Sequence, residues 1–193
     1  YYNLDMIVYV FVGNDLGDQI EKIKNASSLP YAELINDKII PAYMPKDMKD
    51  KILSHYKFIF KGDKDYRPFM EVRDIQNKFF INNIEIQTFK HNHGSIDVLT
   101  YRIGKFAYST DLKNFYENDL DNLQDLDLWV VGLLRSDPHP SHAGFEQILD
   151  YIKYIKPKKT IFTHMTALLD EEKLISKCPK NVLPAFDGME IEI

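Results

Sequence analysis

The stretch from Lys78 to Ser109 constrains the fold most, because it contains two pairs of strand patterns, each pair separated by a two-residue turn. The turns are Asn82-Asn83 and Gly104-Lys105, and both contain residues that accept a positive φ. Strands joined by such turns pair with each other, so this part of the chain is expected to be antiparallel sheet. The expected strands are Lys78–Ile81, Ile84–Phe89, Val98–Ile103 and Phe106–Ser109.

The segments on either side alternate between strand patterns and helix patterns, which indicates an α/β chain with helices on the faces of a sheet. Short runs of β-branched and aromatic residues predict the strands, and apolar residues at helical spacing predict the helices. The charged segment Lys61–Asp74 is expected to be a loop. Expected strands are Met6–Val12, Ile39–Tyr43, Leu128–Leu133, Thr160–Thr163 and Met189–Ile193, and expected helices are Asp18–Lys24, Asp47–Tyr56, Asn114–Leu123, Gly144–Ile155 and Glu171–Lys177.

Composition indicates a globular protein with one domain over residues 1–193. Hydrophobic residues make up 45% and charged residues 27% of the 193 residues, which is enough apolar material for a core. The net charge of −5 and the absence of a basic block argue against nucleic acid as a partner. Cys178 is the single cysteine, which fits a reducing cytoplasm. The apolar N-terminal run is too short to span a bilayer and lacks the features of a secretion signal, so no membrane association is expected.

Polar groups follow several of the predicted buried strands, at the positions where layered α/β proteins build their sites. Imidazoles and carboxylates that converge from separate loops can bind a divalent metal, and a carboxylate has two oxygens with which to bridge two ions. Two ions about 3.5–4 Å apart can clamp the attacking and leaving oxygens of a phosphoester. The residues at strand ends are His93, Asp111, His139, His142 and His164.

Each of these residues also has a structural interpretation without a ligand. His164 alone could be a hydrogen-bonded core histidine, Asp111 could cap a following helix, and the prolines around His139 could shape a turn. His91 alternates with His93 along the strand, so its side chain is expected to face the other way and to be exposed. His55 falls late in a helix, where a cation suits the helix dipole, and no further role is predicted for it.

From about Ile39 to the end, the chain resembles the metallo-β-lactamase fold and, within it, the PhnP-like phosphodiesterase branch. The matching stretches are HNHGSIDVLTYRIGKFAYSTD, PHPSH, PKKTIFTHM and FDGMEIEI. The resemblance implies an αββα sandwich whose first strands would precede Tyr1. It also implies a hydrolase in which a metal-held water attacks a small phosphodiester or cyclic nucleotide. Active relatives are expected to pair, so a homodimer is compatible with this interpretation.

The resemblance also implies roles for the residues at the strand ends. His93 would be a metal ligand, Asp111 would bridge both metals, and His164 would bind the second metal. His142 would contact the phosphate or assist proton transfer, and His139 would lie beside it as a second candidate catalytic residue.

The chain departs from the family at its chief signature, H-x-H-x-D-H, which follows the first buried strand. The aligned segment here is NDLGDQIEKI, in which Asn14, Leu16 and Gln19 replace the three histidines and only Asp18 remains. The first metal would then keep His93 and Asp111 alone, which are too few ligands for tight zinc binding.

The second metal would keep three of its expected ligands in this register. They are Asp18, Asp111 and His164, with Gln19 as a weak oxygen donor. An oxygen-rich set suits Mn²⁺ or Mg²⁺ better than Zn²⁺. The expected cofactor is therefore a divalent metal, Zn or Mn, with one or two ions bound.

Three functions follow from these observations. The first is a metal-dependent phosphodiesterase, and the second is a catalytically impaired relative that acts as a binding or interaction module. The third is an RNA-processing nuclease of the same fold, against which the acidic charge balance argues.

Overall fold

The computed structural model describes residues 39–64 and 67–192. Contacts divide the chain into two compact units, residues 1–76 and 77–193. The predicted strand Met6–Val12 and helix Asp18–Lys24 lie outside the described residues. The single domain expected over residues 1–193 stays a prediction.

The described part of the first unit is a β-α-α-β arrangement. Its strands β1 and β2 pair in parallel, with Ile40 opposite Met70 and Met44 opposite Asp74. A parallel pair needs a crossover connection, which the two intervening helices supply. Ala42, Ile52 and Ile59 are buried in the small core of this unit. The elements are β1 (Ile40–Met44), α3 (Lys46–His55), α4 (Lys57–Lys61) and β2 (Met70–Asp74).

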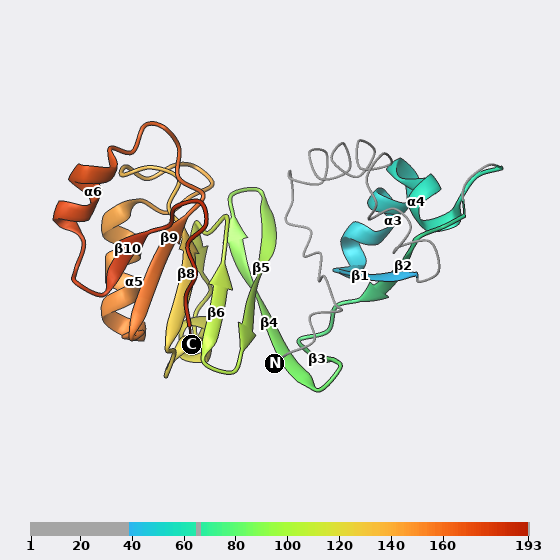
Figure 1. Cartoon of the computed structure of the whole chain (residues 1–193), viewed down its shortest axis with the longest axis horizontal. Coiled ribbons are helices and arrows are strands. Elements are labelled where there is room, and N and C mark those ends of the chain that lie inside the picture. The colour runs from blue at the N-terminus through green and yellow to red at the C-terminus, as the bar shows by residue number, and fades with distance from the viewer. Residues whose placement is uncertain (1–38, 65–66, 193) are drawn as a thin grey trace. The chain divides into compact units, whose positions relative to one another are not determined.

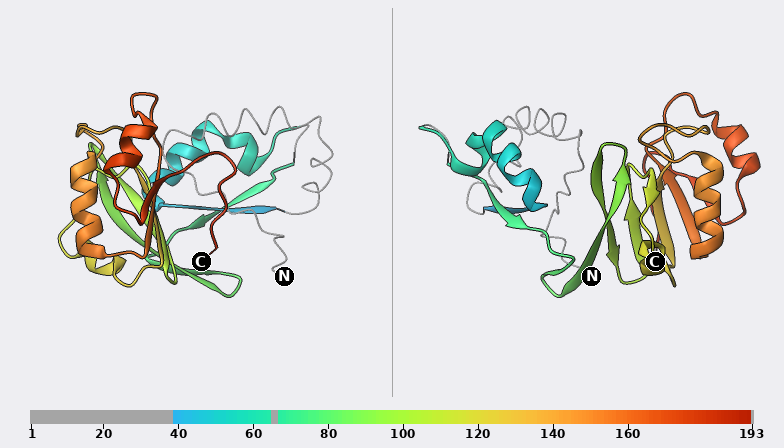
Figure 2. Two further views of the ribbon diagram at one scale, coloured as in Figure 1. Left: turned by 60° about the vertical axis from the view of Figure 1, so that its left-hand side comes forward. Right: turned by 180° about the vertical axis from the view of Figure 1, so that it is seen from behind.

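The second unit contains one mixed sheet with the strand order β10-β9-β8-β6-β5-β4-β3, and β7 pairs with β4. The strands from β3 to β6 pair antiparallel, whereas β6, β8, β9 and β10 pair in parallel. Figures 1 and 2 show the strands side by side with α5 against one face. The strands are β3 (Lys78–Ile81), β4 (Ile84–His93), β5 (Ile96–Ile103), β6 (Phe106–Ser109), β7 (Asn114–Phe115), β8 (Leu128–Gly132), β9 (Lys159–Thr163) and β10 (Val182–Pro184).

The two predicted turns form as the sequence indicates. Asn82 has φ 54° between β3 and β4, and Gly104 has φ 56° between β5 and β6. These left-handed conformations favour glycine and asparagine, and they join neighbouring strands with the twist that a hairpin needs. The antiparallel sheet predicted between Lys78 and Ser109 is therefore confirmed.

Helix α5 (Phe145–Ile155) packs its apolar face on the parallel half of the sheet. Ile148 and Ile152 belong to one buried cluster with Trp129 of β8 and Phe162 of β9. Burying a side chain of this size stabilises the fold by about 1.5–3 kcal/mol. The shorter helix α6 (Glu171–Lys177) adds Leu174 to the same cluster. A sheet with helices packed on it confirms the predicted α/β class.

Three predicted elements are wrong. Asn114–Leu123 is not one helix but the short strand β7, a turn and the 3₁₀ helix η3 (Asp119–Leu123), because Asn118 has φ 70° and interrupts the helical path. The predicted loop Lys61–Asp74 ends in strand β2. Met189–Glu192 forms no strand, and the last strand in the described part of the chain is β10, which pairs with β9.

No helix of the described residues is long and apolar enough to cross a membrane. The cytoplasmic location inferred from the cysteine count stays a prediction.

Candidate functional site

The strand-end residues lie at one edge of the mixed sheet. Strands β6, β8 and β9 run parallel, and β4 runs in the same direction as β6 because both are antiparallel to β5. The carboxyl ends of these strands therefore meet at the same edge. His93 ends β4, Asp111 follows β6, and His164 follows β9. His139 and His142 lie in the loop between β8 and α5.

Asp111 is the central group of this edge. Its Oδ1 atom lies 3.2 Å from Nε2 of His142 and 3.2 Å from Nε2 of His164. The rings of His142 and His164 are stacked, with 5.3 Å between their centroids. One carboxylate oxygen therefore faces two imidazole nitrogens that come from different loops.

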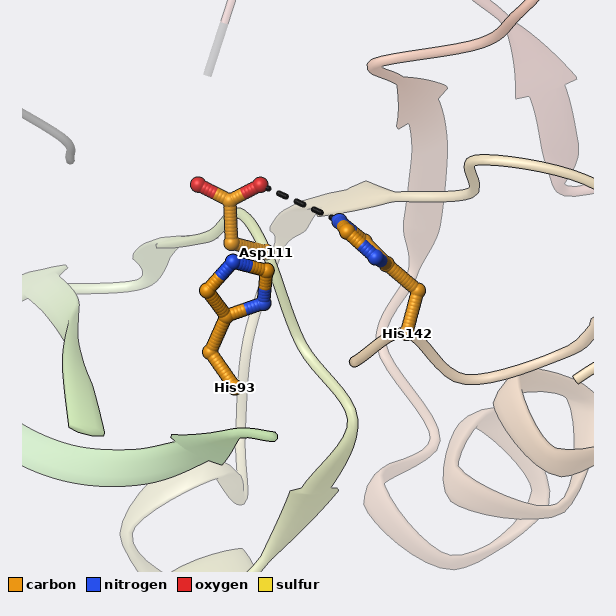
Figure 3. Close-up of side chains that lie close together, drawn as sticks. All are labelled: His93, Asp111 and His142. Atoms are coloured by element: carbon orange, nitrogen blue, oxygen red, sulfur yellow. Dashed lines mark hydrogen bonds and ion pairs between the residues drawn. The ribbon is translucent and has the colours of Figure 1, made fainter. Parts of the chain in front are cut away.

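His93 completes a group of three potential metal donors. One donor atom each from His93, Asp111 and His142 lie within 4.8 Å of one another. Figure 3 shows the three side chains converging, with the His142 ring reaching the carboxylate. The Nδ1 atom of His93 lies 2.9 Å from the carbonyl oxygen of Ser141. A carbonyl only accepts, so Nδ1 donates and Nε2 keeps a free lone pair, as in many metal-binding histidines.

Two of the four residues His93, Asp111, His142 and His164 have backbones in the left-handed region. Asp111 has φ 52° and His164 has φ 59°. Such conformations are uncommon in residues other than glycine, and they cluster at functional sites. Gly132, at the end of β8, lies between these two turns, and a Cβ there would be 3.3 Å from the backbone nitrogen of Asp111. A larger residue at this position would therefore push on the backbone of Asp111 by a few tenths of an ångström.

The loop that carries His139 and His142 is held by close backbone packing. A Cβ on Gly144 would lie 2.8 Å from the backbone nitrogen of Pro138 and 2.9 Å from the carbonyl oxygen of Ser136. Both are backbone atoms, so a larger residue would displace the loop. The Gly94 Cα approaches Ser141 in the same way, because a Cβ there would be 3.1 Å from the Ser141 Cβ.

The site is partly shielded from water. The side chains of His142 and Asp111 are 9% and 16% exposed, whereas that of His164 is 38% exposed. Burial lowers the pKa of His142, although the hydrogen bond with Asp111 acts in the opposite direction. The lowered pKa favours a neutral imidazole, which is the form that binds metals and accepts protons.

His91 corrects an expectation from the sequence. It faces away from His93 as predicted, but it is fully buried instead of exposed. Its ring packs against Phe115 of β7, and its Nε2 atom lies 2.8 Å from the carbonyl oxygen of Thr110. Nδ1 lies 2.9 Å from the hydroxyl of Thr100. Burial lowers the pKa of His91 to about 4, so it is a neutral structural group directly behind the turn that presents Asp111.

The candidates His93, Asp111, His142 and His164 thus come together, and His139 lies outside this group of four. The centroid of the His139 ring is 5.7 Å from that of His142, and the Nδ1 atom of His139 is 2.9 Å from the hydroxyl of Ser141. Asp18 and the neighbouring positions Asn14, Leu16 and Gln19 lie outside the described residues. Sequence reasoning missed the contacts of Ser141 with His93, His139 and His142, for which no pattern gave a signal.

The donors present fit a divalent cation. The carboxylate of Asp111 and the imidazoles of His93, His142 and His164 lie close together at a partly buried edge of the sheet. Two imidazoles that both place Nε2 beside one carboxylate oxygen need either protons or a cation between these atoms. The lowered pKa of His142 disfavours a doubly protonated ring, and a neutral imidazole can offer a lone pair to a cation.

Comparison with protein families identifies a known domain over most of the chain. A family described as the Beta-lactamase superfamily domain matches residues 3–165. This match confirms the resemblance noted in the sequence at the level of the superfamily.

Solved structures share the fold of this chain. A diphosphatase from the PhnP family has a TM-score of 0.76 at 22% identity, covering 89% of this chain and 65% of its own. The metallo-β-lactamase fold protein YhfI from Bacillus subtilis has a TM-score of 0.70 at 14% identity, covering 96% and 76%. The short form of human tRNase Z has a TM-score of 0.60 at 14% identity, covering 82% and 68%. The metallo-β-lactamase fold is therefore confirmed.

A curated relative is an octanoyltransferase from Porphyromonas gingivalis, which is 25% identical over 157 residues. The match covers 78% of this chain and 32% of the relative. The chain thus spans about a third of the length of that protein.

Proposed function

Because the chain belongs to the beta-lactamase superfamily, we propose that it is a metal-dependent hydrolase that cleaves a small phosphodiester in the manner of the PhnP-like branch. The observation that carries the proposal is the meeting of His142 and His164 at one oxygen of Asp111. The similar fold of a PhnP-family diphosphatase supports the choice of a phosphorus ester as substrate.

Asp111, His93 and His164 would hold the cation, which we propose is Zn²⁺ or Mn²⁺. Bound there, the cation would supply Lewis acidity towards a phosphoryl oxygen and lower the pKa of water. Asp18 would add a further carboxylate, as the family signature implies.

The remaining chemistry falls to the chain's own side chains. The Nε2 atom of His142 faces Asp111 and, with the lowered pKa of its ring, can take up and release a proton during ester cleavage. The partial burial of Asp111 keeps its charge poorly screened by water, which strengthens its interaction with a cation. His139 would be the second catalytic residue, at the edge of the site where its ring approaches that of His142.

A small substrate fits the charge of the chain better than RNA does. The net charge of −5 would repel a polyanion, and the chain offers no basic block to offset that repulsion. We therefore propose that fluorescent tRNA will not bind at low salt. Retention of tRNA that weakens with added salt would instead favour a nuclease.

Hydrolysis of bis(p-nitrophenyl) phosphate with added Mn²⁺ or Zn²⁺ tests the proposal. His164→Asn keeps a residue that accepts a positive φ but removes the imidazole, so the rate should fall at least about 100-fold. The matched control is His55→Asn, which changes an exposed histidine at the end of α3 and should keep the parent rate. Equal rates in His164→Asn and the parent would exclude the proposed site.

The second candidate function is a binding or interaction module with impaired catalysis. The loss of three histidines at Asn14, Leu16 and Gln19 favours it. Elemental analysis of the purified chain separates the two candidates. The hydrolase should retain close to one metal atom per chain or more, whereas a module without a working site should retain almost none and show no hydrolysis in either metal.

A further inference from the structure

We propose that Arg135 forms a subsite for a second phosphate group of the substrate, beside the candidate site. The subsite rests on the proposed function, and it narrows the substrate to a phosphodiester that also carries a terminal phosphate. Arg135 lies in the loop between β8 and α5, the same loop that carries His139 and His142. Its side chain is half-buried, whereas the three residues that follow it are exposed.

The guanidinium of Arg135 is held along one edge by the backbone of its own loop. Nε donates to the carbonyl oxygen of Asp137 across 3.3 Å, and Nη2 donates to that of Pro138 across 2.9 Å. A guanidinium has five N–H donors in a fixed fork and no acceptor. The edge between Nη1 and Nη2 therefore keeps two parallel N–H groups that have no partner among the described residues. Such an edge can bind two oxygens of one phosphate.

The charge of Arg135 is not neutralised within the described part of the chain. Asp137 contacts the guanidinium through its carbonyl, and its carboxylate forms no ion pair with it. Arg73 differs in this respect, because its Nη2 atom lies 2.5 Å from a carboxylate oxygen of Glu71. Arginine is always charged in proteins, so the free edge of Arg135 offers both a positive charge and two donors to an anion.

The backbone around Arg135 is fixed before any ligand binds. The carbonyl oxygen of Leu134 accepts hydrogen bonds from the backbone nitrogen and the hydroxyl of Thr166, at 3.2 and 2.9 Å. The carbonyl oxygen of Ser136 accepts one from the backbone nitrogen of Phe145 at 2.8 Å. Because both neighbours of Arg135 are held in this way, binding an anion requires little further ordering of the loop.

The subsite belongs to the His139 side of the candidate site. Pro138, whose carbonyl holds Nη2, directly precedes His139, and the ring of His139 lies 5.7 Å from that of His142 between centroids. A substrate with its diester at Asp111 and His142 would extend past His139 to place a second group at Arg135. A terminal phosphate fits this position, because it carries a charge of about −1.5 to −2 at pH 7 and three acceptor oxygens.

Two matched substrates test the subsite. They are thymidine 5′-(p-nitrophenyl phosphate) and the same compound with an added 3′-phosphate, and both release p-nitrophenolate from the same diester. With Mn²⁺ present, kcat/KM of the parent should be about 10–100-fold higher for the 3′-phosphorylated substrate, because charge-assisted hydrogen bonds hold its second phosphate. The difference should lie mainly in KM. Arg135→Gln should reduce this ratio to about 1.

The controls separate a subsite from a loop support. If Arg135 only braces the loop, Arg135→Gln will slow both substrates by the same factor, and this unchanged ratio would overturn the subsite. Arg135→Lys keeps the charge without the fork and should lower the ratio to between those of the parent and Arg135→Gln. The matched control is Arg102→Gln. Arg102 also bonds two backbone carbonyls, of Gly104 and Asn122, but it lies at the far end of β5, so the parent ratio should be kept.

A binding measurement needs no turnover. Isothermal titration calorimetry of the parent should show about 10–100-fold tighter binding of thymidine 3′,5′-bisphosphate than of thymidine 5′-monophosphate, and Arg135→Gln should lose this preference. Equal affinities in the parent, or a preference that survives Arg135→Gln, would overturn the subsite. An inactive protein that shows the preference and loses it in Arg135→Gln would overturn the hydrolase and leave the subsite intact.

Discussion

The Nε2 atom of His164 lies 3.2 Å from Oδ1 of Asp111, and both residues follow the end of a strand and have a positive φ. The two turns come from neighbouring parts of the parallel sheet, with Gly132 between them. The left-handed backbone of Asp111 and of His164 thus determines where their side chains lie. A substitution that tests either side chain should therefore use a residue that accepts a positive φ.

Asp111→Asn isolates the charge of the central carboxylate. Asparagine accepts a positive φ as readily as aspartate, so the fold should be kept and the melting temperature should stay near that of the parent. Phosphodiester hydrolysis and metal binding should fall at least about 100-fold, because a neutral amide is a poor metal donor. Kinetics and metal titration check this expectation. Asp111→Ala should add a backbone cost of about 1–2 kcal/mol to the same loss.

Gly144→Ala should displace the loop that carries His142. The new Cβ would meet backbone atoms of Pro138 and Ser136 at less than 3.0 Å, and neither can move without the loop. We expect a loss of about 1–3 kcal/mol in the free energy of unfolding together with weaker metal binding. Urea unfolding and metal titration measure the two effects.

The matched control for that loop is Gly104→Ala. Gly104 has φ 56° and open space around a new Cβ, so alanine there costs only backbone strain of about 1–2 kcal/mol. Metal affinity should be unchanged, because the turn lies at the opposite end of β5 and β6 from Asp111. Equal metal affinity in the two variants would contradict the role assigned to Gly144.

His91→Phe should destabilise the fold without touching a metal donor. It removes the partner of the buried Thr110 carbonyl, whereas the Thr100 hydroxyl keeps its hydrogen bond to the hydroxyl of Ser109. Each buried polar group left without a partner costs about 1–3 kcal/mol. Thermal or urea unfolding measures the loss. His55→Phe, at an exposed histidine, should change stability by about 0.5 kcal/mol or less.

Tyr101 predicts a loss of stability at alkaline pH. Burial raises the pKa of Tyr101 to about 12 from the ordinary tyrosine value of 10.0. The unfolded chain therefore releases the phenolic proton at a lower pH than the folded protein does. The stabilisation present below pH 10.0 is lost as the pH rises from there towards about 12. The full shift corresponds to about 3 kcal/mol.

Tyr101→Phe removes the titrating group and should remove this part of the pH dependence. Urea unfolding of both proteins at a series of alkaline pH values gives the comparison. The difference in unfolding free energy between parent and variant should shift in favour of the variant as the pH rises. A constant difference would show that Tyr101 does not titrate differently in the folded and unfolded chains.

The sequence predicted those elements whose signals are local. Asn82 and Gly104 stand in turns with positive φ, and the apolar spacing of Ile148 and Ile152 marks the buried face of α5. The Asn114–Leu123 segment has a similar polar and apolar mixture, but its path depends on Asn118, whose left-handed backbone no periodicity reveals. Local pattern alone could not distinguish a helix from a strand and a turn there.

The candidate site could be predicted only as a set of strand ends. The convergence of Asp111 and His164 follows from parallel strands that share one edge, which the alternation of strands and helices already implied. The burial of His91 does not follow, because alternation gives the direction of a side chain and not what covers it. Phe115 covers it from a strand that the sequence did not predict.

The mixed sheet also sets an order in which the molecule can assemble. In the antiparallel half, short turns join the strands, so the strands pair at a small cost in conformational entropy. In the parallel half, each pairing first requires a longer crossover segment to fold, which is slower. His93 belongs to the early half, and His142 and His164 are delivered by the late one. The metal-binding residues are therefore not all in place until the crossovers that carry His142 and His164 have folded. Binding of the cation should coincide with the slowest folding phase.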